Sequence, residues 1–211
     1  MTFIYRQLIN ILFPVIIVLI FVRVWLKKED KNRFKEKLFT SSFNTTRNKD
    51  KKLIWFHAAS IGEVKSIIPL IKKLNTNNKF EFLITSVTTS SSKLIIEQLS
   101  HEKNIIHRFF PIDKQNIVIK FLENWSPDLI LFVDSEIWPN FLFEIKKRNI
   151  PLILLNGRIT KKTFVRWKLI PKVAEKIFQT FDLCLASSNK SKDYLEKLNA
   201  KNVKHIGNLK L

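Results

Sequence analysis

Short apolar runs alternate with longer segments of helical periodicity from residue 53 to the end of the chain. Seven runs are predicted to be strands: Leu53–His57, Phe80–Thr85, Ile105–Phe110, Asp128–Val133, Pro151–Asn156, Leu183–Ala186 and Val203–Ile206. Six segments are predicted to be helices: Glu63–Leu74, Ser91–Leu99, Asn116–Trp125, Pro139–Arg148, Lys161–Thr180 and Lys190–Leu198. Strands that alternate with helices form βα units on a parallel sheet. The predicted fold class over residues 53–211 is therefore α/β, a Rossmann-like parallel sheet with flanking helices.

A nearly continuous apolar segment precedes this region. Between Leu8 and Leu26 only Asn10 and Arg23 are polar, and the segment would extend roughly 28 Å as a helix. No small-residue cleavage site follows it, which argues against a removed signal peptide. Residues 1–26 are predicted to be a membrane anchor, with a buried or interfacial helix as the alternative. Pro14 and Arg23 weaken the prediction that the anchor fully spans the bilayer.

The formal net charge of +19 requires an anionic partner, which is nucleic acid, a membrane surface or a phosphorylated substrate. Residues 27–52 carry ten Lys or Arg against four Asp or Glu, and residues 161–176 carry six against one. The first segment follows the apolar helix directly, so residues 27–52 are predicted to be a basic linker on the cytoplasmic side of a membrane, next to anionic lipid. No aromatic-basic RNA or DNA motif is present, so no nucleic acid partner is expected.

The second basic segment, residues 161–178, is amphipathic, and Pro171 is expected to kink or interrupt its helix. It fits a surface that lies against anionic lipid, and equally an ordinary helix with a solvated basic face. Cys184 is the only cysteine, so no internal disulfide is possible, and it is predicted to be a reduced core residue. The four histidines are too scattered to predict a metal site.

The first strand leads into Ser60-Ile-Gly-Glu63, at the position where an open α/β sheet places its chemistry. The chain contains three glycines, so each, Gly62 included, is predicted to mark a special backbone geometry or a close approach. Ser60 and Glu63 have the spacing of a capping box, which is a purely structural role. The alternative is that the Glu63 carboxylate is a general base that takes a proton from a sugar hydroxyl.

Two further groups of polar residues follow apolar strands. Asp134 and Glu136 lie after residues 129–133, with Pro139 at the start of the next helix, and Arg158 follows residues 151–156. The carboxylates fit a functional crevice, and they also fit simple neutralisation of the helix N-terminus. Arg158 is suited to bidentate binding of phosphate or carboxylate, or to a structural salt bridge.

Four segments in this order and spacing resemble one family: WFHAASIGEVKSIIPLIKKL, DSEIWPN, IPLILLNGRIT and HIGNLK. They are similar to the N-terminal half of 3-deoxy-D-manno-octulosonic acid (Kdo) transferases, and the resemblance covers nearly the whole chain. It implies the first Rossmann-like domain of a glycosyltransferase of the B-type fold (GT-B). The implied reaction is inverting transfer of Kdo from CMP-Kdo to the lipid A precursor lipid IVA, with no cofactor and no metal.

The resemblance also implies roles for single residues. Glu63 matches the family's catalytic base, Asp134 matches an acidic residue that supports the transition state, and Lys210 matches a lysine that faces the anionic donor. The family usually has Glu at the position of Asp134, so that carry-over is doubtful and Glu136 matches its own position better. Ser60, Gly62, Glu136 and Arg158 are the residues expected to bind substrate.

The family's second domain carries most of the sugar-nucleotide site, and the resemblance places the end of this chain near the boundary between the two domains. The sequence therefore predicts an acceptor-side domain over residues 53–211 without a donor-binding domain. The alternative to a complete transferase is a non-catalytic, membrane-anchored acceptor-binding domain that needs a separate donor-binding half. That half is then a predicted partner, together with CMP-Kdo, lipid IVA and the anionic membrane surface.

Overall fold

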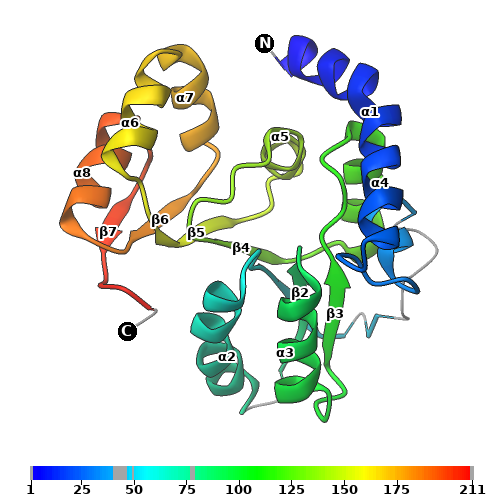
Figure 1. Cartoon of the computed structure of the whole chain (residues 1–211). Helices are drawn as coiled ribbons and strands as arrows, with labels where there is room; N and C mark the ends of the chain where they lie inside the picture. Colours follow the sequence, from blue (N-terminus) through cyan, green and yellow to red (C-terminus); the bar gives the residue numbers. More distant parts are fainter. Residues whose placement is uncertain (1, 40–46, 49, 77–78, 210–211) are drawn as a thin grey trace.

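The computed structural model describes residues 2–39, 47–48, 50–76 and 79–209, and a parallel sheet lies at its centre (Figure 1). Its seven strands are β1 (Lys52–His57), β2 (Phe80–Ser86), β3 (Ile105–Phe109), β4 (Leu129–Val133), β5 (Leu152–Gly157), β6 (Leu183–Ala186) and β7 (Val203–His205). They are arranged in the order β3-β2-β1-β4-β5-β6-β7. The predicted Rossmann-like α/β class is confirmed, and each predicted strand end is within one residue of the observed one.

Helices cover both faces of the sheet (Figure 1). The helices of the α/β region are α2 (Ile61–Asn75), α3 (Thr89–Leu99), α4 (Gln115–Trp125), α5 (Pro139–Lys147), α6 (Lys161–Lys168), α7 (Pro171–Phe178) and α8 (Asn189–Lys197). Buried residues of α2 and α3 pack on one face, and buried residues of α4, α5, α7 and α8 pack on the other. This division follows from the strand order, because right-handed crossovers on either side of β1 and β4 place their helices on opposite faces.

The expected interruption at Pro171 is confirmed. The predicted helix over 161–180 is divided into α6 and α7, and Pro171 is the first residue of α7. Proline has no N–H to donate to the preceding turn, so it ends one helix and begins the next. The short break leaves Leu169 and Ile170 exposed by 78% and 44%.

Aromatic side chains fill the core between β1 and the helices α4 and α5. The Trp55 ring lies 5.0 Å from Phe121 and 5.5 Å from both Phe132 and Phe141, measured between centroids. Its indole N–H donates to the Thr85 hydroxyl at 2.9 Å, so this buried ring keeps its polar group satisfied. Cys184 is buried, as predicted for a core residue, and burial raises the pKa of its thiol to about 12.

Before β1, the chain forms the long helix α1 (Thr2–Trp25) and the 3-10 helix η1 (Phe34–Lys37). Helix α1 lies outside α4 and α5 as an additional layer (Figure 1). Within the segment predicted to be a linker, residues 29–38 pack on the domain, and Lys37 donates to Glu29 at 2.7 Å and to the Val87 carbonyl at 3.2 Å. Residues 40–46 and 49 of the predicted linker lie outside the described residues.

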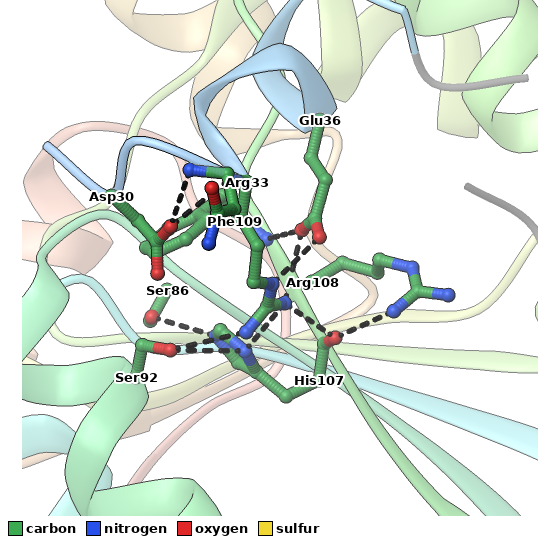
Figure 2. Close-up of polar contacts among 9 residues, drawn as sticks. Asp30, Arg33, Glu36, Ser86, Ser92, His107, Arg108 and Phe109 are labelled. Atoms are coloured by element: carbon green, nitrogen blue, oxygen red, sulfur yellow. Dashed lines mark hydrogen bonds and ion pairs between the residues drawn. The ribbon is translucent and has the colours of Figure 1, made fainter. Parts of the chain in front are cut away.

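A buried polar cluster connects η1 to the β3 edge of the sheet, and Figure 2 shows the Arg33 guanidinium between Glu36 and His107. Arg33 pairs with both oxygens of Glu36, at 2.7 and 3.0 Å, and donates to His107 Nδ1 at 3.1 Å and to the His107 carbonyl at 3.0 Å. Glu36 also accepts the backbone N–H of Phe109 at 2.9 Å. Arg33, Glu36 and the backbone of β3 therefore satisfy one another's hydrogen-bonding groups. Buried charges are tolerated under this condition.

The buried His107 is expected to make the folded state less stable in acid. Burial, together with the charges of Arg33 and Arg108, lowers the pKa of His107 to about 3. Between that value and the ordinary 6.5, the unfolded chain binds a proton that the folded chain excludes, so stability falls as the pH decreases. Urea unfolding should therefore show a difference between wild type and His107→Gln that grows below pH 6.5, by up to about 1.4 kcal/mol per pH unit.

The difference between the two proteins isolates His107. Asp113 has a pKa raised to about 6 by burial, which makes the folded state bind a proton and acts in the opposite direction between pH 4 and 6. Both proteins contain Asp113, so its contribution cancels when they are compared. Parallel pH profiles for the two proteins would contradict the assignment.

Candidate active site

The loops after β1 and β4 flank the point where the strand order reverses. Strands β1 and β4 are direct neighbours, β1 continues into α2 on one face, and β4 continues into α5 on the other. In open α/β sheets this arrangement leaves a crevice outside the carboxyl ends of the strands, and ligands bind there. Most of the residues singled out from the sequence lie on these two loops or on the adjacent loop after β5.

Glu63 occupies the first turn of α2 and forms the expected cap with Ser60, except that its carboxylate accepts the backbone N–H of Ala59 rather than that of Ser60. Ser60 is the N-cap and accepts the Glu63 N–H at 3.4 Å, while its hydroxyl donates to Glu63 Oε1 at 2.6 Å. The Ala59 N–H donates to Glu63 Oε2 at 2.8 Å. The Glu63 residue is 6% exposed. Each carboxylate oxygen has one protein donor here and retains capacity for a second hydrogen bond.

Gly62 does not have the special backbone conformation expected of it. It lies inside α2, and among the described glycines only Gly207 has a positive φ, +85°. Gly157, in β5, is the position of close approach, because a Cβ there would lie 2.9 Å from Leu154 Cδ2. Gly62 is exposed, so its effect is to keep the surface beside Glu63 free of a side chain.

A second cluster joins the ends of β1 and β4. His57 is fully buried at the end of β1, stacks on Phe110 with 3.8 Å between centroids, and contacts Glu136 Oε2 through Nε2 at 3.3 Å. The Trp138 indole N–H donates to the same carboxylate oxygen at 2.8 Å. Burial acts to raise the pKa of Glu136, but the contacts with His57 and Trp138 outweigh it and the pKa is lowered. Glu136 is therefore a fixed, ionised carboxylate.

Asp134 and Arg158 line a polar pocket of about 570 Å³ beyond β4, β5 and β6. Its other lining residues include Asn156, Thr160, Lys161, Ser188, Lys190 and Asn208. Thr160 and Ser188 are the N-caps of α6 and α8 and accept the N–H groups of Thr163 and Ser191 at 3.2 and 3.1 Å. Two helix N-termini and three cationic side chains make this pocket suited to an anion.

The backbone on this rim is unusual at two residues that line the pocket. Asp134 has φ 65° and Asn156 has φ 56°, the left-handed region that non-glycine residues rarely adopt. Their loops are joined, because Ser135 donates to the Arg158 carbonyl. Arg158 is exposed and has no ion pair with any carboxylate in the described part of the chain, so the salt bridge considered as an alternative does not form.

Lys210 lies outside the described residues. The residues that precede it reach the same rim, since Asn208 lines the pocket and the Leu209 N–H donates to Asn156 Oδ1 at 3.0 Å. Glu63 does not line this pocket. The structure thus joins Ser60 to Glu63, and Asp134 to Arg158, but it leaves the two pairs in separate parts of the same edge.

Sequence patterns alone missed the cluster around Glu136. The four histidines are scattered in the sequence, yet His57 contacts Glu136 at one ring nitrogen and the Thr85 hydroxyl at the other, at 3.0 Å. The available signal was its position at the end of the first strand. Thr160 and Ser188 were also missed, although each begins a helix in the manner of an N-cap. No group of three or more His, Cys, Asp or Glu among the described residues forms a candidate metal site.

A family model described as 3-deoxy-D-manno-octulosonic-acid transferase (kdotransferase) matches residues 32–211. Two 3-deoxy-D-manno-octulosonic acid transferases are similar to nearly the whole chain. The one from Rickettsia bellii is 33% identical over 207 residues, which is 98% of this chain and 48% of that protein. The one from Rickettsia prowazekii is 31% identical over 252 residues and covers 100% and 54%. The chain thus spans about half the length of the curated relatives it matches.

The fold also recurs in solved structures of other proteins. The UDP-GlcNAc 2-epimerase from Neisseria meningitidis superposes with a TM-score of 0.50 at 16% sequence identity, over 75% of this chain and 46% of that one. At this identity the similarity extends to the fold alone.

Proposed function

The chain belongs to the Kdo transferase family, and from that premise we propose that it provides the acceptor-side domain of an inverting transferase. The donor would be CMP-Kdo, and the acceptor would be the lipid A precursor lipid IVA on the cytoplasmic face of the inner membrane. The observation that carries the proposal is the position of Ser60-Ile-Gly-Glu63, at the carboxyl end of β1 beside the β4 loop. A carboxylate at a topological switch point lies where α/β proteins bind their ligands.

Glu63 would act as the general base. The acceptor hydroxyl transfers its proton to a carboxylate oxygen of Glu63 as its own oxygen bonds to the anomeric carbon of Kdo. The bond from that carbon to the phosphate oxygen breaks at the same time, and its electrons leave with CMP. The donors Ser60 Oγ and Ala59 N fix the position of the carboxylate before the substrate arrives.

The polar pocket would receive a negatively charged group of one of the substrates. Phosphate and carboxylate are the anionic groups of donor and acceptor, and both match a site made of Arg158, Lys161, Lys190 and two helix N-termini. Asp134 on the same rim would help to orient the sugar, and Lys210, close in sequence to Asn208, would contribute a further positive charge. Glu136 would help to fix the shape of the crevice, because its carboxylate is held in place by His57 and Trp138.

An apolar surface supports the alternative proposal of an acceptor-binding half that requires a donor-binding domain. A hollow of about 750 Å³ between α2 and the open part of the sheet is lined mainly by apolar side chains: Ile54, Leu70, Leu74, Leu129, Leu131, Leu155, Leu185 and Leu209. An apolar hollow of this kind is typical of a surface that another protein unit covers. A donor-binding domain, on the same or another polypeptide, would fit this description.

The proposal is tested by measuring binding and transfer separately. The purified chain, in vesicles that contain lipid IVA, is expected to bind the acceptor but to transfer no Kdo from labelled CMP-Kdo. Transfer should begin when the donor-binding half of a family member is added. Transfer by the chain alone would refute the requirement for that half. Failure to bind lipid IVA would refute the acceptor-side assignment.

A further inference from the structure

Polar side chains near the N-terminus of α1 bind the folded domain, and one near its C-terminus binds the segment that follows the helix. Near its N-terminus, the Tyr5 hydroxyl donates to Asp113 Oδ2 at 2.8 Å, and Arg6 pairs with Glu144 at 3.3 Å. Arg6 Nε also donates to Asn140 Oδ1 at 3.3 Å. Near the other end, Arg23 pairs with Glu29 at 2.7 Å. The accepting carboxylates are deeply buried, with Asp113 and Glu144 each only 3% exposed.

Between these ends, a single stripe of α1 faces the domain. The less exposed positions follow helical spacing over the whole length of the helix: Tyr5, Arg6, Ile9, Phe13, Ile16, Ile17, Ile20 and Val24. The Lys114 ammonium lies 3.6 Å from the centroid of the Phe13 ring, and the rings of Phe21 and Phe34 meet edge-on at 5.5 Å. The opposite face exposes large apolar side chains at Leu8, Ile11, Leu12, Val15, Val18, Leu19 and Val22.

This arrangement is incompatible with a helix that crosses a bilayer. Tyr5 and Arg23 are separated by about 27 Å along the helix, which is close to the ~30 Å thickness of the hydrocarbon core. In a spanning helix, Tyr5 and Arg6 would reach the far side of the membrane while Asp113, Asn140 and Glu144 remained with the domain. Asp113 would then lose the Tyr5 hydroxyl and Glu144 would lose Arg6, although Asp113 would keep the Asn140 and Phe141 N–H groups and Glu144 would keep Arg148. Loss of a donor to a buried carboxylate is destabilising.

We propose that α1 is an in-plane anchor: it stays docked on the domain along its whole length and inserts its outer apolar face into one leaflet of an anionic bilayer. Both ends of α1 then lie on the same side of the membrane as the candidate active site. The proposal does not depend on the transfer reaction.

The side chains on the surface next to α1 indicate that a lipid bilayer contacts this surface. An apolar cavity of about 310 Å³, lined by Tyr5, Phe143, Trp167, Ile170 and Ile177 among others, connects the N-terminal end of α1 to the turn between α6 and α7. Figure 1 shows α1 and α7 on the same side of the sheet, with α5 between them. The exposed Leu169 and Ile170 are flanked by the exposed cations Arg166, Lys168 and Lys172. Apolar side chains surrounded by Lys and Arg match the acyl boundary and anionic headgroups of one leaflet.

Spin-label depth distinguishes an in-plane helix from a spanning one. Leu8, Val15 and Val22 lie seven residues apart on the exposed face, with exposures of 50%, 53% and 44%. Single cysteines would be placed at these positions in a Cys184→Ala background, since Cys184 is the only native cysteine. In vesicles of zwitterionic and anionic phospholipid, we expect nitroxides at all three positions to report the same depth within one leaflet. A maximum at Val15→Cys, with the other two shallower by roughly 10 Å, would overturn the proposal. Labels that all remain in water would overturn it as well.

The side of the membrane reached by the N-terminus provides a second measurement. An uncharged, protease-cleavable tag before Met1 should be removed in inverted inner-membrane vesicles, where the cytoplasmic face is outside, and protected in intact spheroplasts. The opposite pattern would show that α1 crosses the membrane. Neither measurement depends on transferase activity, so failure of the anchor proposal and failure of the proposed function can be told apart.

Discussion

Replacing Glu63 with glutamine in a transfer-competent assembly is expected to lower kcat by about 10²–10⁴-fold, the contribution of a positioned general base. Glutamine retains the length of the side chain, and its amide oxygen still accepts a hydrogen bond from Ala59 N or Ser60 Oγ. It cannot take the proton of the acceptor hydroxyl. The substitution therefore separates the two roles of Glu63, because the helix cap persists while the base is lost. Initial rates at saturating donor and acceptor are the measurement.

Two controls make this result specific. Glu97→Gln makes the same chemical change at an exposed position of α3 and should leave kcat unchanged. Thermal unfolding of Glu63→Gln should remain close to wild type, because the loss of one charged hydrogen bond in the cap costs on the order of 1 kcal/mol. Near-normal turnover by Glu63→Gln would assign Glu63 to a capping role alone. A matched loss of turnover and stability would point to a folding defect.

The sheet was predictable because its signals are local. Each strand is a short apolar run bounded by polar residues, as in Leu183–Ala186, and each helix has its own periodicity. The break at Pro171 follows from the chemistry of one residue. The bond from Ser60 to Glu63 was also predictable, because both groups lie within one helical turn.

The contacts that arrange the rest of the site depend on strand order, which no local pattern encodes. His57 meets Glu136 because β1 and β4 are paired although the two residues are 79 positions apart. Asp134 and Arg158 share a pocket because β4 and β5 are neighbours in the sheet. The docking of α1 depends on Asp113 and Glu144, which only the folded domain brings to one surface. Hydropathy predicts that α1 is a membrane anchor, but it carries no information on the contacts of Tyr5 and Arg6 with the domain.

Arg33 and Glu36 form a buried ion pair in the segment between α1 and β1, and Arg33→Met is expected to lower the free energy of unfolding by about 3 kcal/mol. Glu36 is 4% exposed, and without Arg33 its carboxylate would keep the Phe109 N–H as its remaining strong donor (Figure 2). Methionine retains an apolar stem of similar length, but it removes the guanidinium carbon that lies 5.0 Å from the centroid of the Phe109 ring, so the loss includes this cation–π contact. Arg108 interacts electrostatically with Glu36 and offsets part of the loss, which places the expected value at the lower end of the 3–5 kcal/mol range.

Urea unfolding of three variants distinguishes a buried charge from lost contacts. Lys35→Met removes an exposed cation from the same 3-10 helix and should change stability by less than about 0.5 kcal/mol. The double variant Arg33→Met/Glu36→Gln should be more stable than Arg33→Met, because it leaves no unpaired carboxylate in the interior. If the double variant were as unstable as the sum of the two single variants, the pair would be stabilising through packing, and the electrostatic explanation would be wrong. Because this cluster joins η1 to β3, a loss of stability here should also release the C-terminal end of α1, with its Arg23–Glu29 pair, from the domain.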